Sequence, residues 1–216
     1  MVTWVLIACN ILVFLWELGL GPGFETRALG LAFVPARFFG HDPHAGEAAS
    51  RVVPLLASMY MHAGWLHLLG NMLYLYIFGD NVEDALGHVP FLLFYTASGV
   101  VAALAQGFAA PASKVPMVGA SGAIAGVLGA YFVLYPGARV VTLIPIFIFF
   151  QIIEVPAFFF LLFWFLLQFV SGALASAAHS GLQGGVAWWA HVGGFVTGLA
   201  AALAVRVARA SSRRSR

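Results

Sequence analysis

A serine and several histidines lie in otherwise apolar stretches of this sequence. The polar residues concerned are His62, His67, Asn71, Ser121 and His191. A serine hydroxyl within hydrogen-bond reach of an imidazole is an activated nucleophile, because the imidazole can take its proton. If the fold brings Ser121 to one of the histidines, we expect nucleophilic chemistry. The elements that carry these residues must therefore be identified first.

The composition indicates a membrane protein. Only 18 of the 216 residues are formally charged (10 basic and 8 acidic), and 62% are hydrophobic. A soluble domain has about 25% charged residues, and the mean hydropathy of +0.96 agrees with a membrane location. This argues against a soluble enzyme, a disordered chain or a nucleic-acid-binding domain. Polar side chains at membrane depth are costly and are functional candidates by default.

The stretches between charged residues predict six membrane-spanning helices, each needing about 20 apolar residues. One span each falls in Val2–Leu20 and in the runs 52–79, 85–113 and 115–138, and two fall in the run 155–205, separated at Ser176–Gly185. We expect residues 1–205 to form an all-α six-helix membrane bundle.

Two further segments are expected to lie at the membrane surface or in connections. The loop Gly21–Arg51 is too small and too apolar to be a domain, so we expect it to lie against the bilayer. The apolar run Val140–Phe150 is short and is punctuated by Pro145 and Pro156, so we interpret it as an interfacial or buried connection rather than a seventh span.

The basic segment 206–216 predicts the orientation, because it holds five of the ten basic residues and cytoplasmic segments near a membrane accumulate Arg and Lys. We expect this segment to be a cytoplasmic tail, and an even number of spans places the N-terminus on the same side. The composition and the lack of a targeting leader favour a bacterial plasma membrane.

The expected topology places the polar residues at one depth. The second, fourth and sixth helices run in the same direction, and we expect the fourth to begin near Pro116 and the sixth near Gly185. His67, Ser121 and His191 then lie about 5–9 Å below the starts of their helices. Two pairs of glycines at GxxxG spacing, typical of close helix packing, would bring the fourth and sixth helices together. These pairs are Gly122 with Gly126 and Gly194 with Gly198.

Each of these features also has a structural explanation. GxxxG pairs usually serve packing alone, and a serine in a membrane helix often bonds its own backbone. A metal or haem protein using His62, His67 and His191, or a transporter with glycine-broken helices, is the main alternative. The absence of HExxH argues against a zinc protease. The proposed common depth of the polar residues favours a catalytic site.

Three motifs together resemble the rhomboid family of intramembrane serine proteases. They are HAGWLHLLGN, GASG and AHVGGFVTG, and the likeness runs over Trp4–Val205. The resemblance implies that Ser121 is the nucleophile and His191 the general base of a catalytic dyad that works through an acyl-enzyme. It also implies that the substrates are transmembrane proteins in the lipid bilayer, with no cofactor, metal or nucleic acid involved.

Other positions acquire roles from the same resemblance. His67 and Asn71, with the Ser121 backbone N–H, correspond to the groups that stabilise the oxyanion. The residues that correspond to supporting or packing positions are His62, Gly119, Gly122, Gln168, Gly194 and Gly198.

The sequence departs from the family at two places, and no acid completes a triad. Ser50-Arg51 stands where many members have Trp-Arg. Ala125 replaces an aromatic residue that stacks on the base in some members, and we expect Trp188 or Trp189 to take that role if any residue does.

Overall fold

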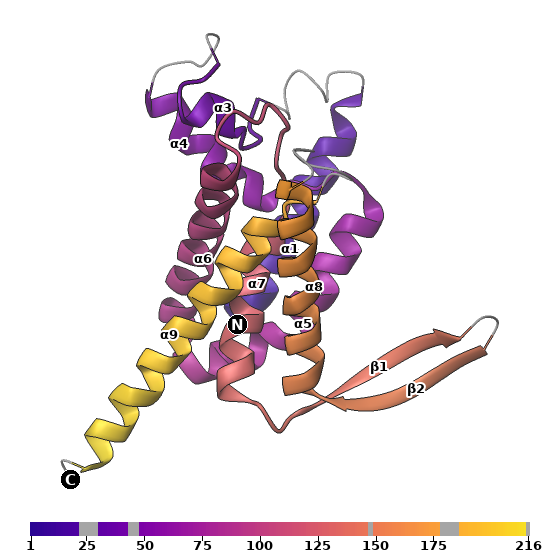
Figure 1. Ribbon diagram of the computed structural model, residues 1–216, viewed down its shortest axis with the longest axis vertical. Helices are drawn as coiled ribbons and strands as arrows, with labels where there is room; N and C mark the ends of the chain where they lie inside the picture. Colours follow the sequence, from indigo (N-terminus) through magenta and orange to yellow (C-terminus); the bar gives the residue numbers. More distant parts are fainter. Residues whose placement is uncertain (22–29, 43–47, 147–148, 178–185, 215–216) are drawn as a thin grey trace.

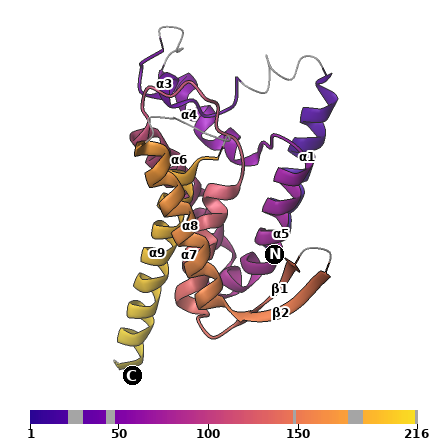
Figure 2. The ribbon, with the colours of Figure 1, turned by 45° about the vertical axis from the view of Figure 1, so that its right-hand side comes forward.

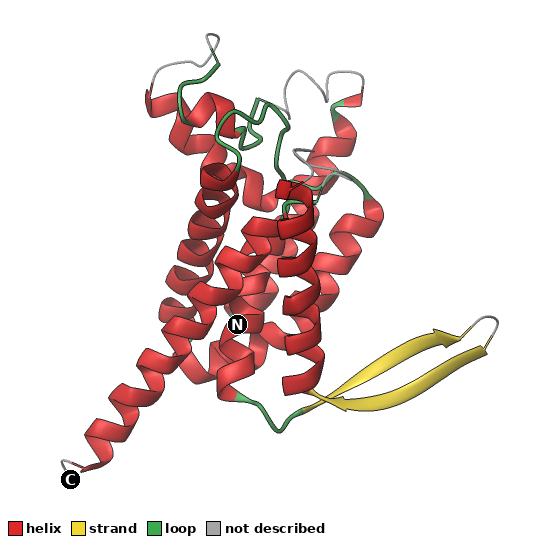
Figure 3. Ribbon diagram, viewed as in Figure 1, coloured by secondary structure: helices red, strands yellow, loops and turns green. Residues whose placement is uncertain are grey.

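The chain folds into a bundle of apolar helices with one β-hairpin attached at its base (Figures 1 and 3). The computed structural model describes residues 1–21, 30–42, 48–146, 149–177 and 186–214. The helices are α1 (Val2–Gly19), α3 (Pro35–Phe38), α4 (Ala48–Ala57), the 3-10 turn η2 (Ser58–Tyr60), α5 (Trp65–Leu86), α6 (His88–Ala109), α7 (Ser121–Leu134), α8 (Ala157–Ala177) and α9 (Trp188–Arg214). The strands are β1 (Arg139–Ile146) and β2 (Phe149–Pro156).

The predicted helical membrane bundle is confirmed, although the helices differ in how they could cross a bilayer. Among the described residues, four helices are long and apolar enough to span it: α1, α6, α8 and the Trp188–Ser211 part of α9. A fifth span requires α4 and η2 to count with α5, from which they are bent by 80°. The run 52–79, in which one span was expected, is thus divided by a bend between Tyr60 and Trp65.

Helix α7 is short because it begins later than the sequence predicted. It starts at Ser121 rather than near Pro116, and its 14 residues cover about 21 Å, less than the roughly 30 Å of a bilayer core. The preceding segment is extended and pairs with the first loop, where Phe33 and Met117 exchange backbone hydrogen bonds of 3.1 and 2.8 Å. Gly119 then takes a φ of +125°, which turns the chain into the helix.

Short as it is, α7 forms the centre of the bundle. Helices α5, α6, α8 and α9 all contact it, and Figure 2 shows it enclosed between them. Ten of its residues are buried. A helix that is apolar all round and enclosed by protein is suited to hold a side chain at a fixed position inside a membrane protein.

The two glycine pairs face each other as predicted and bring the backbones of α7 and α9 into contact. A methyl group at Gly194 would overlap the carbonyl of Gly122, and one at Gly198 would overlap the carbonyl of Gly126. This close approach fixes the first turns of the two helices relative to each other, and those turns carry Ser121 and His191.

The base of the bundle, the end where α7 finishes, is held by charged residues. The buried Glu83 carboxylate accepts hydrogen bonds from the backbone of Val2 (2.6 Å) and from the backbone and hydroxyl of Thr3 (2.8 and 2.6 Å), which ties α1 to α5. Arg206 donates to the Val133 carbonyl at 3.3 Å, and Arg209 donates to the Ala85 carbonyl. Helix α9 continues without a break through the predicted boundary at 205/206 to Arg214.

The apolar run after α7 forms an element that the all-α expectation did not include. Strands β1 and β2 pair in antiparallel fashion over their whole length, from Arg139 opposite Pro156 to Ile146 opposite Phe149. The prolines that suggested an irregular connection lie within the hairpin, which has two open edges where a missing N–H is tolerated.

Two predicted features fall partly outside the described residues. These are the break between the last two helices, including the start expected near Gly185, and much of the loop Gly21–Arg51. The described part of that loop contains α3 and the start of α4.

Candidate active site

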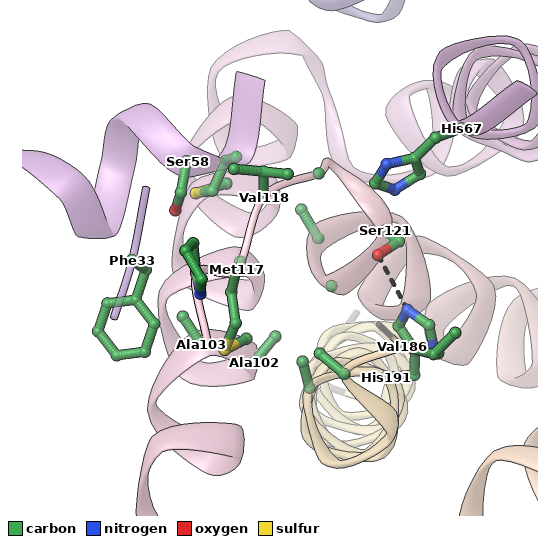
Figure 4. Close-up of a pocket in the computed structure, with 18 of the residues that line it drawn as sticks. Phe33, Ser58, His67, Ala102, Ala103, Met117, Val118, Ser121, Val186 and His191 are labelled. Carbon is green, nitrogen blue, oxygen red and sulfur yellow. Dashed lines mark hydrogen bonds between the residues drawn. The ribbon is translucent and has the colours of Figure 1, made fainter. Parts of the chain in front are cut away.

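Ser121 and His191 meet where α7 and α9 begin, and Figure 4 shows the two side chains pointing toward each other. Ser121 is the first residue of α7 and His191 lies in the first turn of α9. The Nε2 atom of His191 is 2.9 Å from the Oγ atom of Ser121. The contact predicted between the fourth and sixth helices is therefore present, and it has the geometry of a nucleophile and its base.

The other ring nitrogen of His191 contacts Gln168 of α8. Oε1 of Gln168 lies 2.7 Å from Nδ1, and an amide oxygen can only accept a hydrogen bond. Nδ1 therefore carries the hydrogen, which leaves Nε2 free to accept from the Ser121 hydroxyl. From the sequence, Gln168 was expected only at a packing position, and its contact with His191 was not predicted. The one sign of this contact in the sequence is that Gln168 is polar, whereas the rest of the stretch FWFLLQFV is apolar.

The aromatic neighbour of the His191 ring is Trp164, not Trp188 or Trp189. The centroids of the Trp164 and His191 rings are 5.7 Å apart, at 39°. Trp189 is engaged elsewhere, because its backbone N–H donates to Gln106 and its indole N–H donates to Ser176. Helix α8 thus contacts the imidazole through two side chains: Gln168 accepts a hydrogen bond from it, and the Trp164 ring packs against it.

His67 lies on the opposite side of Ser121 from His191 (Figure 4). The backbone N–H of Ala63 donates to Nδ1 of His67 at 3.4 Å, so the ring hydrogen is on Nε2. A methyl group at Gly119 would lie 2.7 Å from that Nε2 and 3.6 Å from Nδ2 of Asn71. The N–H donors of His67 and Asn71, both on α5, thus lie close to the backbone of Gly119, two residues before Ser121.

Asn71 has a donor that is free for another group. Its side chain is buried, and within the described part of the chain Nδ2 has no hydrogen-bond partner. A buried unpaired amide costs free energy unless something else pairs with it. The backbone N–H of Ser121, at the N-terminus of α7, is a further donor without an intrahelical partner. Together these donors could bind an anionic oxygen next to the Ser121 hydroxyl.

His62 packs against His67. Its side chain is 1% exposed, and its ring meets the His67 ring edge to face with centroids 5.1 Å apart. Its backbone N–H donates to the Glu17 carboxylate at 3.1 Å, which ties the segment before α5 to α1. These contacts give His62 a packing role against His67.

A cavity of about 370 Å³ opens beside the serine. Ser121, His67 and His191 line one part of it, and the remainder is largely apolar, with contributions from Met117 and Ala102. The segment before α7, α6 and residues 186–187 form its other walls. A small side chain and a water molecule could both reach the serine through this space.

The side chains at the site are arranged for proton transfer rather than for metal binding. Within the described ranges, no three His, Cys, Asp or Glu residues are placed to hold a metal ion.

Comparison with known proteins gives one consistent result. A family model described as the Rhomboid domain matches residues 49–208, which include Ser121 and His191. The chain is 32% identical over 150 residues to the presenilin-associated rhomboid-like protein, mitochondrial, of Homo sapiens, covering 67% of this chain and 36% of that protein.

Two proteins of Bacillus subtilis (strain 168) are also similar. The putative rhomboid protease YdcA is 39% identical over 77 residues, covering 36% of this chain and 38% of that protein. The rhomboid protease GluP is 36% identical over 129 residues, covering 59% of this chain and 23% of that protein. The chain thus matches only a minor part of the length of each relative.

Proposed function

Because this chain belongs to the rhomboid family, we propose that it is an intramembrane serine protease. It hydrolyses peptide bonds in or near the transmembrane segments of membrane-protein substrates. The observation that carries this proposal is the 2.9 Å contact between Oγ of Ser121 and Nε2 of His191. The names of the two Bacillus relatives, both described as rhomboid proteases, support the same reaction class.

In the first half of the reaction, His191 accepts the Ser121 proton at Nε2 while Oγ attacks the substrate carbonyl carbon. The tetrahedral intermediate collapses when His191 returns that proton to the leaving amine, and the substrate acyl group stays on Ser121. In the second half, His191 takes a proton from water and the resulting hydroxide attacks the ester carbon. As the ester C–O bond breaks, His191 returns the proton to Oγ of Ser121, and the acid product is released. Each step uses the same ring nitrogen.

The oxyanion formed in both halves needs donors on the side of Ser121 away from His191. Nε2–H of His67, Nδ2–H of Asn71 and the backbone N–H of Ser121 are the proposed donors. Each such hydrogen bond contributes about 10²–10³ in rate when it forms only in the transition state. The unpaired Nδ2 of Asn71 supports this role, since a bound oxyanion would satisfy it.

Gln168 takes the place of the third triad member as a positioning residue. It keeps the hydrogen of His191 on Nδ1, as the aspartate of a soluble triad does, but it has no negative charge to stabilise the imidazolium. We therefore expect slower turnover than in a soluble triad, where losing the function of that carboxylate costs about 10⁴ in kcat.

A substrate helix must expose a carbonyl to reach Ser121. Helices hide their backbone carbonyls in internal hydrogen bonds, so the substrate has to unwind locally. Small or helix-breaking residues near the end of its span would favour this. The family resemblance suggests entry between α5 and α8, where the Phe78 and Phe160 rings stack at 6.4 Å toward the base and would mark the closed end of the passage.

The proposal is tested with a single-span substrate and purified enzyme in liposomes. We expect the wild-type enzyme and Ser176→Ala to cleave it, because the Ser176 hydroxyl hydrogen-bonds with Trp189 and with neither Ser121 nor His191. Ser121→Ala and His191→Ala should reduce cleavage to background. A fluorophosphonate probe should label the wild type and Ser176→Ala but not Ser121→Ala. Cleavage that survives loss of the Ser121 hydroxyl would refute the dyad.

A further inference from the structure

We propose that Glu17, a buried carboxylate of α1, is a positioning residue for His67. It holds the backbone of residues 61–64, called here the α5 entry, and through this backbone it fixes the orientation of the His67 ring. The inference rests on the proposed function, in which the N–H of His67 stabilises the oxyanion.

Glu17 lies near the end of α1, and only 3% of its surface is exposed. Burying a carboxylate is costly unless it is paired or hydrogen-bonded, and an ionisable residue within a membrane helix is a functional candidate by default. None of the ion pairs among the described residues includes Glu17. The contact that its carboxylate does make is with the backbone N–H of His62, at 3.1 Å. This hydrogen bond therefore offsets the burial of the carboxylate.

The α5 entry is the irregular segment where η2 and α5 meet at an angle of 80°. Irregular backbone within a membrane protein needs partners for its N–H groups. Side chains supply them for two successive residues of the α5 entry. The N–H of His62 donates to Glu17, and the N–H of Ala63 donates to Nδ1 of His67 at 3.4 Å. A carboxylate and an imidazole thus hold neighbouring peptide groups.

The two hydrogen bonds are linked through His62. Its N–H and the N–H of Ala63 belong to adjacent planar peptide groups that share the His62 Cα atom, so fixing the first restricts the second. The His62 side chain is 1% exposed and packs against the His67 ring, which leaves it little freedom to rotate. Glu17 therefore positions the Ala63 N–H. That N–H in turn keeps the ring hydrogen of His67 on Nε2, next to Gly119.

Glu17 differs from the contacts that join α1 and α5 at the base of the bundle. There the Glu83 carboxylate accepts from the backbone and hydroxyl of Thr3, about 24 Å along α5 from His67. Those contacts join the two helices, whereas Glu17 contacts the backbone that precedes α5. Thr3→Val removes one hydrogen bond to Glu83 and is therefore a matched control, because it weakens the same pair of helices far from the site.

Two substitutions separate the reach of the Glu17 side chain from its charge. Glu17→Gln keeps an oxygen acceptor at the same distance from the backbone, whereas Glu17→Asp keeps the charge but withdraws the acceptor by about 1.5 Å. Cleavage of the single-span substrate in liposomes gives kcat and KM. We expect Glu17→Gln to keep most of the wild-type kcat. In Glu17→Asp, kcat should fall about 10- to 100-fold with KM unchanged, since a misplacement of about 1 Å costs up to about 10²-fold.

Combination with His67→Ala tests whether Glu17 acts through His67. The rate at which a fluorophosphonate labels Ser121 is measured for the wild type, the two single variants and the double variant, because slow labelling remains measurable where turnover does not. Glu17→Asp should slow labelling when His67 is present and should not slow it further in His67→Ala, since residues that act through one contact are not additive. Thr3→Val should lower the melting temperature and leave the labelling rate unchanged in both backgrounds.

Three results would overturn the proposal. Wild-type kcat in Glu17→Asp would show that the reach of the side chain does not matter, and loss of activity in Glu17→Gln would assign the role to its charge. Equal slowing by Glu17→Asp with and without the His67 ring would show that Glu17 serves stability alone. A wild-type protein that neither cleaves the substrate nor is labelled at Ser121 would refute the proposed function, and this inference with it.

Discussion

The two ring nitrogens of His191 contact different side chains, and each contact has its own consequence. The hydrogen bond that the Ser121 hydroxyl donates to Nε2 concerns the proton that moves in the reaction. The hydrogen bond that Nδ1–H donates to Gln168 concerns the orientation and tautomer of the ring. Removing the first should abolish the chemistry. Removing the second should only slow it.

Gln168→Leu tests the positioning role. Leucine has a similar size but cannot accept a hydrogen bond, so part of the His191 population would carry its hydrogen on the wrong nitrogen. We expect kcat to fall about 10- to 100-fold, the usual range for losing a partner that orients a functional histidine, while KM stays the same. Cleavage kinetics over a range of substrate concentrations separate the two constants.

Gln168→Glu is the matched variant, since it restores an oxygen acceptor at the same distance from the backbone. It should recover most of the kcat lost in Gln168→Leu. If both variants lose activity together with thermal stability, Gln168 serves packing alone and the positioning role is wrong.

Gly119 is the residue for which a single added methyl group should disable the oxyanion donors. Its φ of +125° is unfavourable for any residue with a Cβ atom, and that Cβ would lie 2.7 Å from His67. In Gly119→Ala, His67 must move away, and we expect kcat to drop by about 10²–10³, the value of one donor. Initial cleavage rates at saturating substrate measure this.

Gly137→Ala is the control for that experiment, because an added Cβ at Gly137 meets nothing within 4 Å. It should cleave at the wild-type rate. Equal activity of the two alanine variants would show that the contact between Gly119 and His67 does not matter for catalysis.

The meeting of Ser121 and His191 could be predicted from the sequence, but the surroundings of the imidazole could not. Helices that run in the same direction place residues near their starts at similar depths, and the glycine pairs indicated which two helices touch. Gln168 and Trp164 contact His191 because of the rotation of α8 about its axis. A helix that is apolar on every side gives no sequence pattern from which this rotation can be deduced.

At the scale of elements, the contact between α7 and α9 holds the site together. Gly198→Ala adds a methyl group where the Gly126 carbonyl already lies. Overpacking of this kind costs about 1–3 kcal/mol, and separation of the helices would also lengthen the Ser121–His191 contact. We expect a lower melting temperature together with reduced cleavage, both measured in the same detergent.

Gly70→Ala is the corresponding control on α5, where an added Cβ meets nothing within 4 Å. Replacing a helical glycine by alanine at an open position stabilises a helix by up to about 1 kcal/mol, so its melting temperature should not fall. A stable and active Gly198→Ala protein would show that close backbone contact is not required.

Element boundaries were predicted less well than element order. Helix α5 begins at Trp65, directly after Gly64, within the run where a span was expected. Helix α7 begins only at Ser121, because the segment before it pairs with Phe33, which is far away in the sequence. The hairpin was missed because its prolines and apolar residues fit a buried connection equally well. Its β-branched and aromatic residues were the available indication of strands.

At the scale of the whole molecule, the Ser121–His191 site lies at one end of the bundle, and the contacts of Glu83, Arg206 and the Arg139–Glu154 pair lie at the other. Ser121 begins α7, whereas Glu83, Arg206 and the Arg139–Glu154 pair lie at the base where α7 ends. A substrate would therefore be cut close to the face of the membrane opposite the base. Which cellular compartment that face meets depends on the orientation of the bundle.

The arginines of the last eleven residues lead us to expect the base, and with it the C-terminus, in the cytoplasm. In bacteria, a C-terminal green fluorescent protein should then fluoresce, because it folds in the cytoplasm, and a C-terminal alkaline phosphatase should be inactive. Fusions after Lys114, between α6 and α7, should give the opposite pair of results, since this segment leads to the other end of α7.

Replacing the five terminal arginines by glutamine should weaken this preference for a cytoplasmic C-terminus and yield a mixed population, because these charges are the main asymmetry of the chain. Phosphatase activity at the unaltered C-terminus would instead place Ser121 near the cytoplasmic surface and restrict the substrates to membrane proteins cut on that side.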